Sequence, residues 1–278
     1  MSTLHAIRAA LLGAAFLLTL TACSTPAPWR GSRAGTVAWA SERDFAASEL
    51  DAGQFKLLAL TRQRNPECQT LSVYIEGDGA PWVTPWQAPR DPTPLTPTAL
   101  LMAAVDPAGA VAYLGRPCQY QSAESLAACS PRWWTDQRFA PDVLAAYDDA
   151  LTQLKTRLCG QHLRLVGYSG GGVIAAQLTA HRADVAALVT VASPLALTDW
   201  GAWHELAPFT NASDPALEPG TLPPGIHWAG GKDRIVPIQI VEKFTQRKGG
   251  QLQIQPGYDH ECCWARDWAR LVAMENPP

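Results

Sequence analysis

A single serine lies within a run of glycines near the middle of the sequence. The stretch Gly167-Tyr168-Ser169-Gly170-Gly171 matches the pattern G-x-S-x-G and has apolar residues on both sides. Where such a stretch joins a strand to a helix, the turn exposes the serine hydroxyl as a nucleophile, and the first amides of the helix can stabilise an oxyanion. A plain glycine-rich turn or a phosphate-binding turn is the alternative, but the sequence has no Walker lysine and no GxGxxG pattern.

A serine nucleophile needs a general base, and His260 is the histidine best placed to provide it. It lies in the stretch PGYDHECCW, between the last predicted strand and the last predicted helix. The other histidines fall at the wrong end of a strand or helix, inside a strand, or in a loop where a substrate contact is the alternative role. In that order they are His162 and His181, His227, and His204.

An aspartate between the serine and the histidine would orient the imidazole ring and stabilise its protonated form. Asp233 is the first choice, because WAGGKDRIVP ends a predicted strand and places this residue in the loop that follows. Asp199, after the preceding strand, is the second choice. Asp259 is too close to His260 in sequence to align its carboxylate with the ring. The ordinary alternative for Asp233 is a loop or helix-capping aspartate.

Apolar segments alternate with amphipathic segments along the chain, which predicts strand–helix–strand units and a mostly parallel α/β sheet in one domain. Functional residues of such a sheet gather at the carboxyl ends of its strands. Residues 36–45 are predicted to add an antiparallel edge strand. The other predicted strands are 55–62, 71–77, 110–116, 163–169, 185–193, 225–231 and 251–257, and the predicted helices are 141–158, 171–182, 237–249 and 264–276.

With Ser169, Asp233 and His260 in this order, the chain resembles the α/β-hydrolase superfamily over residues 36–276. The serine turn, GGKDRIVP and GYDHECCW match the turns after strands five, seven and eight of that fold. The resemblance implies a sheet of about eight strands flanked by helices, a Ser-His-Asp triad, an acyl-enzyme intermediate and no cofactor. A carboxylic ester is the implied bond, while amide, peptide and acyl-transfer chemistry stay open. YIEGDGAPW, YLGRPCQY and RWWTDQRF are similar to a little-characterised group of proteobacterial hydrolases.

The predicted oxyanion hole departs from the pattern of that superfamily. Many members end strand three with His-Gly, whereas this chain has EGDG at positions 76–79. The resemblance assigns the oxyanion amides to Gly170 and Asp78, with Gly79 as the alternative to Asp78. Carboxylates so close to an oxyanion are unfavourable unless they point away or are paired with cations. Two arginines are candidates for that pairing, Arg116 and Arg132.

Seven cysteines suit an exported chain in an oxidising compartment. Strands three and five are neighbours in the superfamily's sheet, and cysteines lie just before each of them, which implies a disulfide between Cys68 and Cys159. Cys118 and Cys129 could close a loop, and buried free thiols are the alternative. Adjacent Cys262 and Cys263 are left to bond each other or to stay reduced. No CxxC or HxxxH spacing supports a metal site.

The loops at 79–100, 117–138 and 194–224 are expected to contact an acyl substrate, either a small molecule or a lipid. Tryptophans in these loops could form an apolar or sugar-stacking wall, or could pack the loops themselves. A formal charge of −3 without a basic run excludes a nucleic-acid surface. The tryptophans concerned are Trp82, Trp86, Trp133, Trp134, Trp200 and Trp203.

The N-terminal residues predict export and lipid attachment. Residues 1–22 combine a weakly basic start with a short apolar run, as in a signal peptide, and LTAC resembles a lipobox that ends at Cys23. Residues 23–35 are predicted to be a tether and 36–278 the hydrolase domain. The lipidated Cys23 would attach the protein to a membrane of the cell envelope, with Ser24 favouring the outer membrane and the periplasmic side.

Two kinds of function are therefore compatible with the sequence. The first is a lipid-anchored serine hydrolase that uses Ser169, His260 and Asp233. The second is a non-catalytic envelope lipoprotein that keeps the fold as a binding module. The complete set of serine, histidine and aspartate favours the hydrolase, because a binding module has no need to retain all three.

Overall fold

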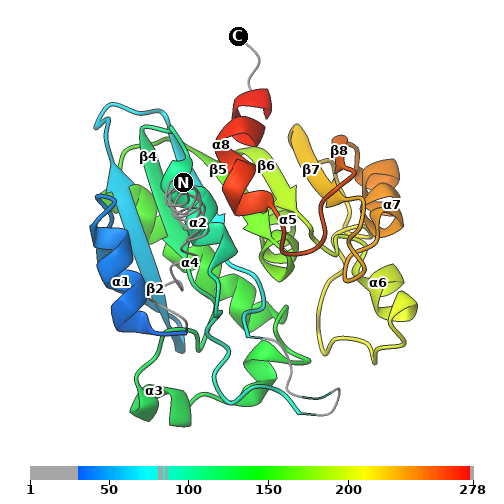
Figure 1. The fold of residues 1–278 in the computed structure, drawn as a ribbon, viewed down its shortest axis with the longest axis horizontal. Helices are drawn as coiled ribbons and strands as arrows, with labels where there is room; N and C mark the ends of the chain where they lie inside the picture. Colours follow the sequence, from blue (N-terminus) through cyan, green and yellow to red (C-terminus); the bar gives the residue numbers. More distant parts are fainter. Residues whose placement is uncertain (1–30, 81–83, 85–86, 276–278) are drawn as a thin grey trace, which may run out of the picture.

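The structure is a computed structural model that describes residues 31–80, 84 and 87–275. Its centre is one eight-stranded sheet in the order β1-β2-β4-β3-β5-β6-β7-β8 (Figure 1). The β1–β2 and β2–β4 pairs are antiparallel, and all other neighbouring pairs are parallel, which confirms the expected sheet. The strands are β1 (Ala46–Ala52), β2 (Phe55–Gln63), β3 (Thr70–Ile75), β4 (Ala110–Leu114), β5 (His162–Tyr168), β6 (Val185–Val191), β7 (Gly225–Gly230) and β8 (Gln251–Gln255).

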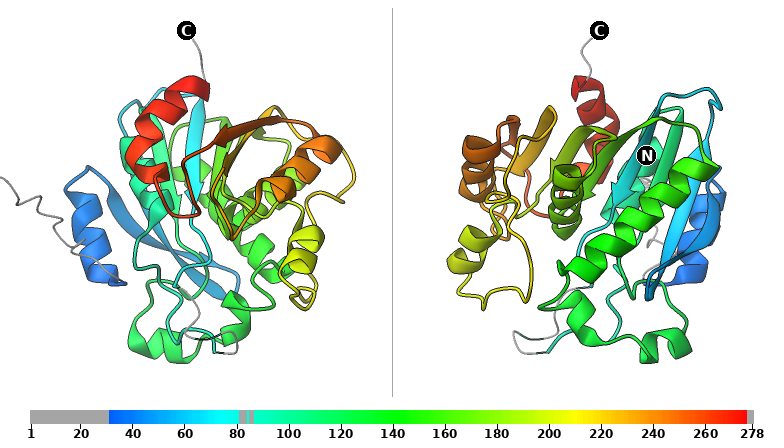
Figure 2. Two further views of the ribbon diagram at one scale, coloured as in Figure 1. Left: turned by 45° about the vertical axis from the view of Figure 1, so that its right-hand side comes forward. Right: turned by 180° about the vertical axis from the view of Figure 1, so that it is seen from behind.

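Helices cover both faces of the sheet (Figures 1 and 2). They are α1 (Arg33–Ser41), α2 (Thr98–Val105), α3 (Ala123–Ala127), the 3-10 helix η1 (Pro131–Trp134), α4 (Pro141–Arg157), α5 (Gly170–His181), α6 (Leu197–Trp203), α7 (Ile238–Lys248) and α8 (Trp264–Glu275). Helices α1, α2 and α8 contribute to the core on one face, and α4 to α7 contribute to the core on the other. No helix in the described part of the chain is both long and apolar enough to cross a membrane.

The central elements follow directly from the apolar pattern. Strand β4 is buried over its whole length, and β3 at every position except its first, as expected for strands covered by helices on both faces. The four helices expected from amphipathic segments, now α4, α5, α7 and α8, lie within one residue of their predicted bounds. The parallel strands therefore end together at one edge of the sheet, where the loops that carry the candidate residues begin.

The strand predicted at 36–45 is wrong, because most of this segment belongs to helix α1. The side chain of Ser32 caps the start of this helix by accepting a backbone N–H. The edge strand is instead β1, which forms a hairpin with β2. Only Leu50 and Ala52 of β1 are buried, and three of its other residues are polar. The strand therefore lacks the apolar run by which the other strands were predicted.

Most of the N-terminal predictions concern residues outside the described ranges. The predicted signal peptide at 1–22, Cys23 and the following residues up to position 30 lie there. Helix α1 begins at Arg33, so the last three residues of the predicted tether at 23–35 form the first turn of a helix. The described part of the chain is therefore already helical three residues before the predicted start of the domain.

Three disulfides are formed within the described residues. One joins the segments before β3 and β5, with 5.5 Å between the Cα atoms, and a second closes the loop after β4. Both correspond to expected pairs. The third joins two adjacent cysteines in the loop after β8, across a cis peptide bond. The pairs are Cys68–Cys159, Cys118–Cys129 and Cys262–Cys263.

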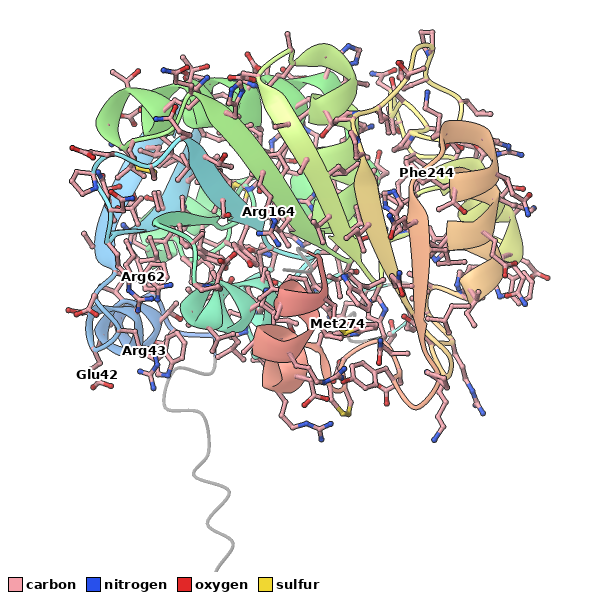
Figure 3. All side chains as sticks on the ribbon, turned by 90° about the horizontal axis from the view of Figure 1, so that it is seen from above. Glu42, Arg43, Arg62, Arg164, Phe244 and Met274 are labelled. Atoms are coloured by element: carbon pink, nitrogen blue, oxygen red, sulfur yellow. A yellow bond between two sulfur atoms is a disulfide. The ribbon has the colours of Figure 1, made fainter. Side chains whose placement is uncertain are left out.

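A buried polar network attaches helices α2 and α8 to the sheet. Arg62 on β2 donates to the carbonyl oxygen of Asp106 at 2.8 Å, just after α2 ends, and Arg164 on β5 pairs with the carboxylate of the same aspartate at 3.0 Å (Figure 3). Trp268 on α8 donates to the hydroxyl of Tyr74 on β3 at 2.8 Å. Because both helices are held in this way, the N-terminus of α2 is fixed beside the end of β3, where the candidate oxyanion turn begins.

Candidate active site

Ser169 stands at the turn between β5 and α5, at the carboxyl edge of the sheet. Its backbone has φ 51° and ψ −126°, a conformation that residues with side chains seldom adopt. The neighbouring glycines allow close packing around this turn. A Cβ on Gly167 would lie 2.3 Å from the Cα of Gly172, and a Cβ on Gly172 would lie 2.0 Å from Ser193 Oγ. The glycine run therefore lets helix α5 start directly behind a serine that is held in a strained conformation.

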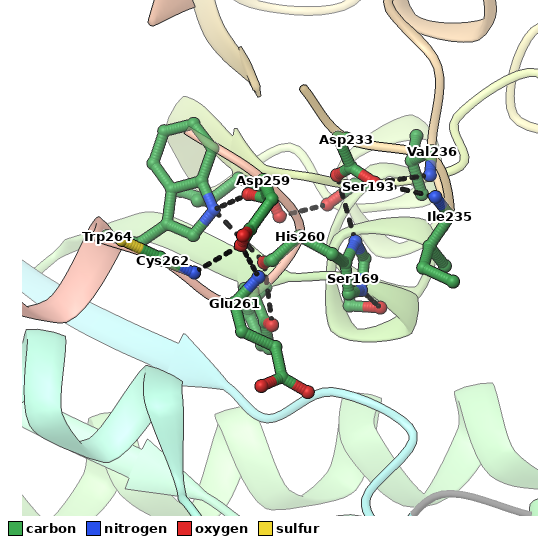
Figure 4. A network of polar contacts seen from close by, with 12 residues as sticks. Ser169, Ser193, Asp233, Ile235, Val236, Asp259, His260, Glu261, Cys262 and Trp264 are labelled. Carbon is green, nitrogen blue, oxygen red and sulfur yellow. Dashed lines mark hydrogen bonds and ion pairs between the residues drawn. The ribbon is translucent and has the colours of Figure 1, made fainter. Parts of the chain in front are cut away.

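The three residues expected to form a triad lie in one hydrogen-bonded chain (Figure 4). His260 Nε2 is 3.0 Å from Ser169 Oγ, and His260 Nδ1 is 2.9 Å from Asp233 Oδ2. The Asp233 side chain is fully buried, whereas the His260 side chain is 17% exposed. The imidazole can therefore exchange protons with the serine on one side, while a desolvated carboxylate orients it on the other.

Asp233 is held by the loop that follows β7. Its Oδ1 atom accepts the backbone N–H groups of Ile235 and Val236, each at 2.8 Å (Figure 4). Two amide donors on one carboxylate oxygen leave the other oxygen, Oδ2, directed at His260. The two amides therefore fix the position of the carboxylate that accepts the hydrogen bond from the imidazole.

The two alternative aspartates have other partners. Asp199, on α6, pairs with Lys243 and with Arg247 on α7, so its carboxylate is already neutralised away from the triad. Asp259 Oδ1 accepts the backbone N–H groups of residues 261 and 262, at 3.0 and 2.7 Å. Asp259 therefore shapes the turn that carries the histidine and does not contact the imidazole nitrogens.

The backbone of His260 is fixed from two sides. Its carbonyl oxygen accepts the hydroxyl of Tyr168 at 3.0 Å and the indole N–H of Trp264 at 3.1 Å. The adjacent Cys262–Cys263 disulfide closes the same loop at its far end. Because Tyr168 immediately precedes the serine, this hydrogen bond links the histidine loop to the nucleophile turn.

The remaining histidines have other environments. His204 lies 2.8 Å through Nε2 from the carbonyl oxygen of Ile235, so it connects α6 to the aspartate loop. His227 is buried on β7 with Nδ1 2.9 Å from Thr190 Oγ1, and burial lowers its pKa to about 4. Exposed His162 and His181 lie on β5 and at the end of α5, away from the serine turn. No second histidine is therefore placed to serve Ser169 in the described residues.

The turn after β3 faces the start of α5. A Cβ on Gly170 would lie 1.9 Å from Asp78 Oδ1, so the Asp78 side chain lies directly against this glycine. The backbone N–H groups of Asp78, Gly79 and Gly170 donate to no other described residue. Free amides at this point are what an oxyanion hole requires.

Two buried arginines neutralise the carboxylate of Asp78. Arg116, one of the two arginines expected to pair with it, has its Nη1 atom 3.1 Å from Oδ1. Arg138 Nε lies 2.8 Å from Oδ2 but is not aligned for a hydrogen bond. The other expected partner, Arg132, instead stacks over the ring of Trp133 at 4.5 Å. Sequence reasoning missed Arg138, because nothing in the stretch RWWTDQRF distinguishes its second arginine from its first.

Glu76 is the second carboxyl group beside the oxyanion turn, and it is buried. Its Oε1 atom accepts the backbone N–H groups of Gly77 at 2.9 Å and of Ala99 at 3.3 Å, whereas Oε2 has no hydrogen-bond partner among the described residues. Burial raises the pKa of Glu76 to about 7. Below pH 7 most of the Glu76 carboxyl groups are therefore uncharged, which avoids a second negative charge beside the oxyanion site.

A cavity of about 800 Å³ opens at Ser169 and His260. Two of the six tryptophans expected over the site, Trp134 and Trp200, line it, together with Leu95, Leu206 and Ile235. An adjoining hollow of about 710 Å³ is lined by the aspartate and histidine loops. The larger cavity has the size and mainly apolar lining of a small-molecule site.

Two of the other four tryptophans are described by the structure, and neither of these two lines this cavity. Trp133 is buried and packs edge-on against Phe55, with 5.0 Å between the ring centroids. Trp203 is exposed at the end of α6. Trp82 and Trp86 lie outside the described residues. The described part of the chain also contains no cluster of three or more His, Cys, Asp or Glu residues that could hold a metal ion.

Comparisons with known proteins match the architecture but not the sequence. No model of a protein family and no curated protein matches the chain. The esterase Pf2001 from Pyrococcus furiosus has a similar structure, with a TM-score of 0.55, 12% identity, and coverage of 83% of this chain and 88% of that one. An α/β serine hydrolase homologue from Coxiella burnetii gives a TM-score of 0.54 at 13% identity, over 83% of this chain and 96% of that one. The chain has the α/β-hydrolase fold.

A third solved structure shares this α/β-hydrolase fold. It is an α/β serine hydrolase from Xanthomonas campestris that is described as having no lid. Its TM-score is 0.52 at 14% identity, over 84% of this chain and 96% of that one. At these identities the likeness establishes the α/β-hydrolase fold, and function has to be argued from the residues of this chain.

Proposed function

We propose that this protein is a serine hydrolase that cleaves an acyl ester through an acyl-enzyme intermediate. The observation that carries the proposal is the hydrogen-bonded chain from Ser169 Oγ through His260 to the buried carboxylate of Asp233. Ser169 and His260 line a cavity large enough for a small acyl substrate. The three roles of nucleophile, general base and orienting acid are thereby assigned to residues in mutual contact.

In the first half of the reaction, Ser169 Oγ attacks the carbonyl carbon while its proton moves to His260 Nε2. The tetrahedral intermediate then expels the alcohol, which takes the proton from Nε2 as the carbon–oxygen bond breaks. In the second half, water attacks the acyl-enzyme in the same way, and its proton returns through His260 to Ser169. Asp233 accepts the Nδ1–H hydrogen bond throughout and stabilises the imidazolium form.

The backbone N–H groups of Asp78 and Gly170 would bind the oxyanion. The two residues lie against each other beside the serine, and neither amide donates to an acceptor among the described residues. The arginines paired with the Asp78 carboxylate supply an excess of positive charge, so this carboxylate does not oppose the negative charge that forms on the carbonyl oxygen. The side chain that departs from the superfamily pattern is thus compatible with the reaction.

An ester substrate and an envelope location complete the proposal. The mainly apolar cavity favours an acyl group, and the structurally similar Pyrococcus furiosus protein is an esterase. The lipobox-like LTAC and three disulfides favour export and attachment of lipid to Cys23. Incorporation of a clickable palmitate analogue into the wild type, but not into Cys23→Ser, tests this part separately.

A fluorophosphonate probe tests the catalytic proposal, because it reacts with an activated serine. The wild type is expected to be labelled and to hydrolyse 4-nitrophenyl esters, whereas Ser169→Ala is expected to do neither. Ser48→Ala, on the edge strand β1, is the matched control and keeps both properties. An unlabelled wild type, or equal labelling of Ser169→Ala, would instead support a binding module without catalysis.

A further inference from the structure

Large apolar side chains stand exposed around the mouth of the Ser169 cavity. Leu95, Leu206 and Ile235 line the cavity, yet they remain 51%, 46% and 50% exposed. Trp203, at the end of α6, is 57% exposed. We call these four residues the mouth rim. Exposed apolar residues gathered at one place mark a site of interaction with another apolar surface.

Three members of the mouth rim, Trp203, Leu206 and Ile235, belong to two segments that are joined by hydrogen bonds. Trp200 Nε1 and His204 Nε2 both donate to the carbonyl oxygen of Ile235, at 2.6 and 2.8 Å. Helix α6 and the aspartate loop are thus joined. Trp203 is the last residue of that helix, and the backbone N–H of Leu206 donates to the carbonyl oxygen of Gly201 within it, at 2.9 Å. The exposed side chains are therefore presented on a supported surface beside the cavity.

The first described residue, Gly31, lies beside Leu95, the fourth member of the mouth rim. Gly31 lies so close to Leu95 that a Cβ at this position would be 3.4 Å from Leu95 Cδ2. Gly31 lies eight positions after Cys23, the predicted lipid-attachment site. Even a fully extended chain of that length reaches only about 28 Å. A lipid on Cys23 would therefore hold the mouth rim close to the membrane surface.

The short tether also excludes the opposite orientation. A domain of this size is roughly 45 Å across, which is longer than the tether can reach. Val105 is the last residue of helix α2, and Met274 lies in the last turn of helix α8. The chain passes from Val105 to the start of β4, and helix α8 runs to the same end of the sheet (Figure 1), so both residues lie toward the amino edge and away from the cavity. The tether cannot extend from Leu95 around the domain to place that edge on the membrane.

We infer that the mouth rim rests on the lipid surface that holds Cys23, and that the substrate is an acyl ester of a lipid in that membrane. The inference rests on the proposed function, because it assigns the substrate class of the same site. An acyl chain that leaves the bilayer at the mouth rim enters the apolar cavity without crossing water. Tryptophan and leucine side chains are suited to the boundary between acyl chains and headgroups.

Contact with the bilayer can be measured without any catalysis. The lipidated full chain, purified from membranes, is reconstituted into phosphatidylethanolamine and phosphatidylglycerol vesicles whose acyl chains carry bromine, which quenches nearby tryptophan. The wild type is expected to show quenching that Trp203→Phe largely removes. Equal quenching of the two proteins would overturn the contact, whether or not Ser169 is an active nucleophile.

Rates measured in the same vesicles test the substrate class. The ratio of phospholipid hydrolysis to hydrolysis of water-soluble 4-nitrophenyl acetate is expected to fall about tenfold in Trp203→Ser/Leu206→Ser. Val105→Ser/Met274→Ser removes two similarly exposed apolar side chains at the other end of the domain and is expected to keep the ratio. An equal ratio in both double variants would overturn the inference.

Lengthening the tether tests the geometry, with all residues of the site unchanged. A flexible insert of thirty residues between Cys23 and Gly31 lowers the effective concentration of the mouth rim at the bilayer, so the same ratio is expected to fall about fivefold. An unchanged ratio would show that the tether does not set the orientation. If the wild type hydrolyses neither substrate, the proposed function fails, and the quenching measurement still decides the contact with the bilayer.

Discussion

The two sides of Ser169 hold their carboxylates by different means. On the acid–base side, Asp233 is held by two backbone amides of its own loop. On the oxyanion side, Asp78 is held by the guanidinium groups of Arg116 and Arg138, which come from two other loops. The first arrangement is local and uses no cation, whereas the second depends on long-range packing and buries charge.

This difference separates chemistry from stability. A change on the acid–base side leaves the surrounding fold intact, because the amides of the loop can still bond to a side chain of the same shape. A change at one of the two arginines on the oxyanion side removes a buried cation from the network that holds Asp78, which costs folding free energy. Substitutions on the two sides should therefore differ in what they damage.

The largest expected effect is on the acid–base side. Asp233→Asn keeps the shape of the side chain but removes the charge that stabilises the imidazolium, so kcat for ester hydrolysis is expected to fall about 10⁴-fold with little change in the midpoint of unfolding. Asp199→Asn, whose carboxylate pairs with α7, is the matched control and should retain kcat. Loss of activity in Asp199→Asn alone would reassign the acid.

The next effect is on the oxyanion side and appears in stability. Arg138→Gln leaves the Asp78 carboxylate with one cation, and the free energy of unfolding in urea is expected to fall by about 4 kcal/mol. Arg132→Gln removes an exposed arginine that stacks on Trp133, and its cost should stay near 1 kcal/mol. Similar losses in the two variants would remove the distinction between the two sides of Ser169.

The smallest expected effect depends on pH. Burial raises the pKa of Glu76 to about 7 in the folded protein, so the folded state holds this proton more tightly than the unfolded state does. The free energy of unfolding should therefore decrease as pH rises from about 4.5 through 7, by about 3 kcal/mol at pH 8.

Glu76→Gln cannot ionise and should lose this part of the pH dependence. Glu67→Gln, at an exposed position before β3, should keep the wild-type profile. Urea unfolding followed at pH 5 and pH 8 gives both values. If the free energy of unfolding depends on pH in the same way in the wild type and in Glu76→Gln, ionisation of the Glu76 carboxyl group costs little folding free energy.

The sequence predicted the acid–base side because its signals are local. The serine turn, the aspartate after β7 and the histidine after β8 each follow an apolar strand directly, so strand order alone brings them to one edge. The same holds for the central strands and for the four helices with a clear amphipathic pattern. The Cys68–Cys159 pair was implied by the resemblance, because strands three and five are neighbours in the superfamily's sheet, as β3 and β5 are here.

The sequence did not predict the features that depend on distant packing. Arg138 pairs with Asp78 because the loop before α4 folds back over the oxyanion turn, and no local pattern marks that approach. Residues 36–45 contain a short alternation of apolar and polar residues, which predicts a strand but also occurs in a helix with one apolar side such as α1. Strand β1 is mostly polar, since an edge strand needs to bury only one row of side chains.

The shared carbonyl of Ile235 has a consequence for changing the substrate range by design. It accepts hydrogen bonds from Trp200, a wall of the cavity, and from His204, while the backbone N–H of the same residue bonds to Asp233. Grafting a different 194–224 loop to reshape the pocket would therefore also alter the support of the acid. Selection for new specificity should begin from libraries that keep Trp200 and His204 and vary the opposite wall around Leu95.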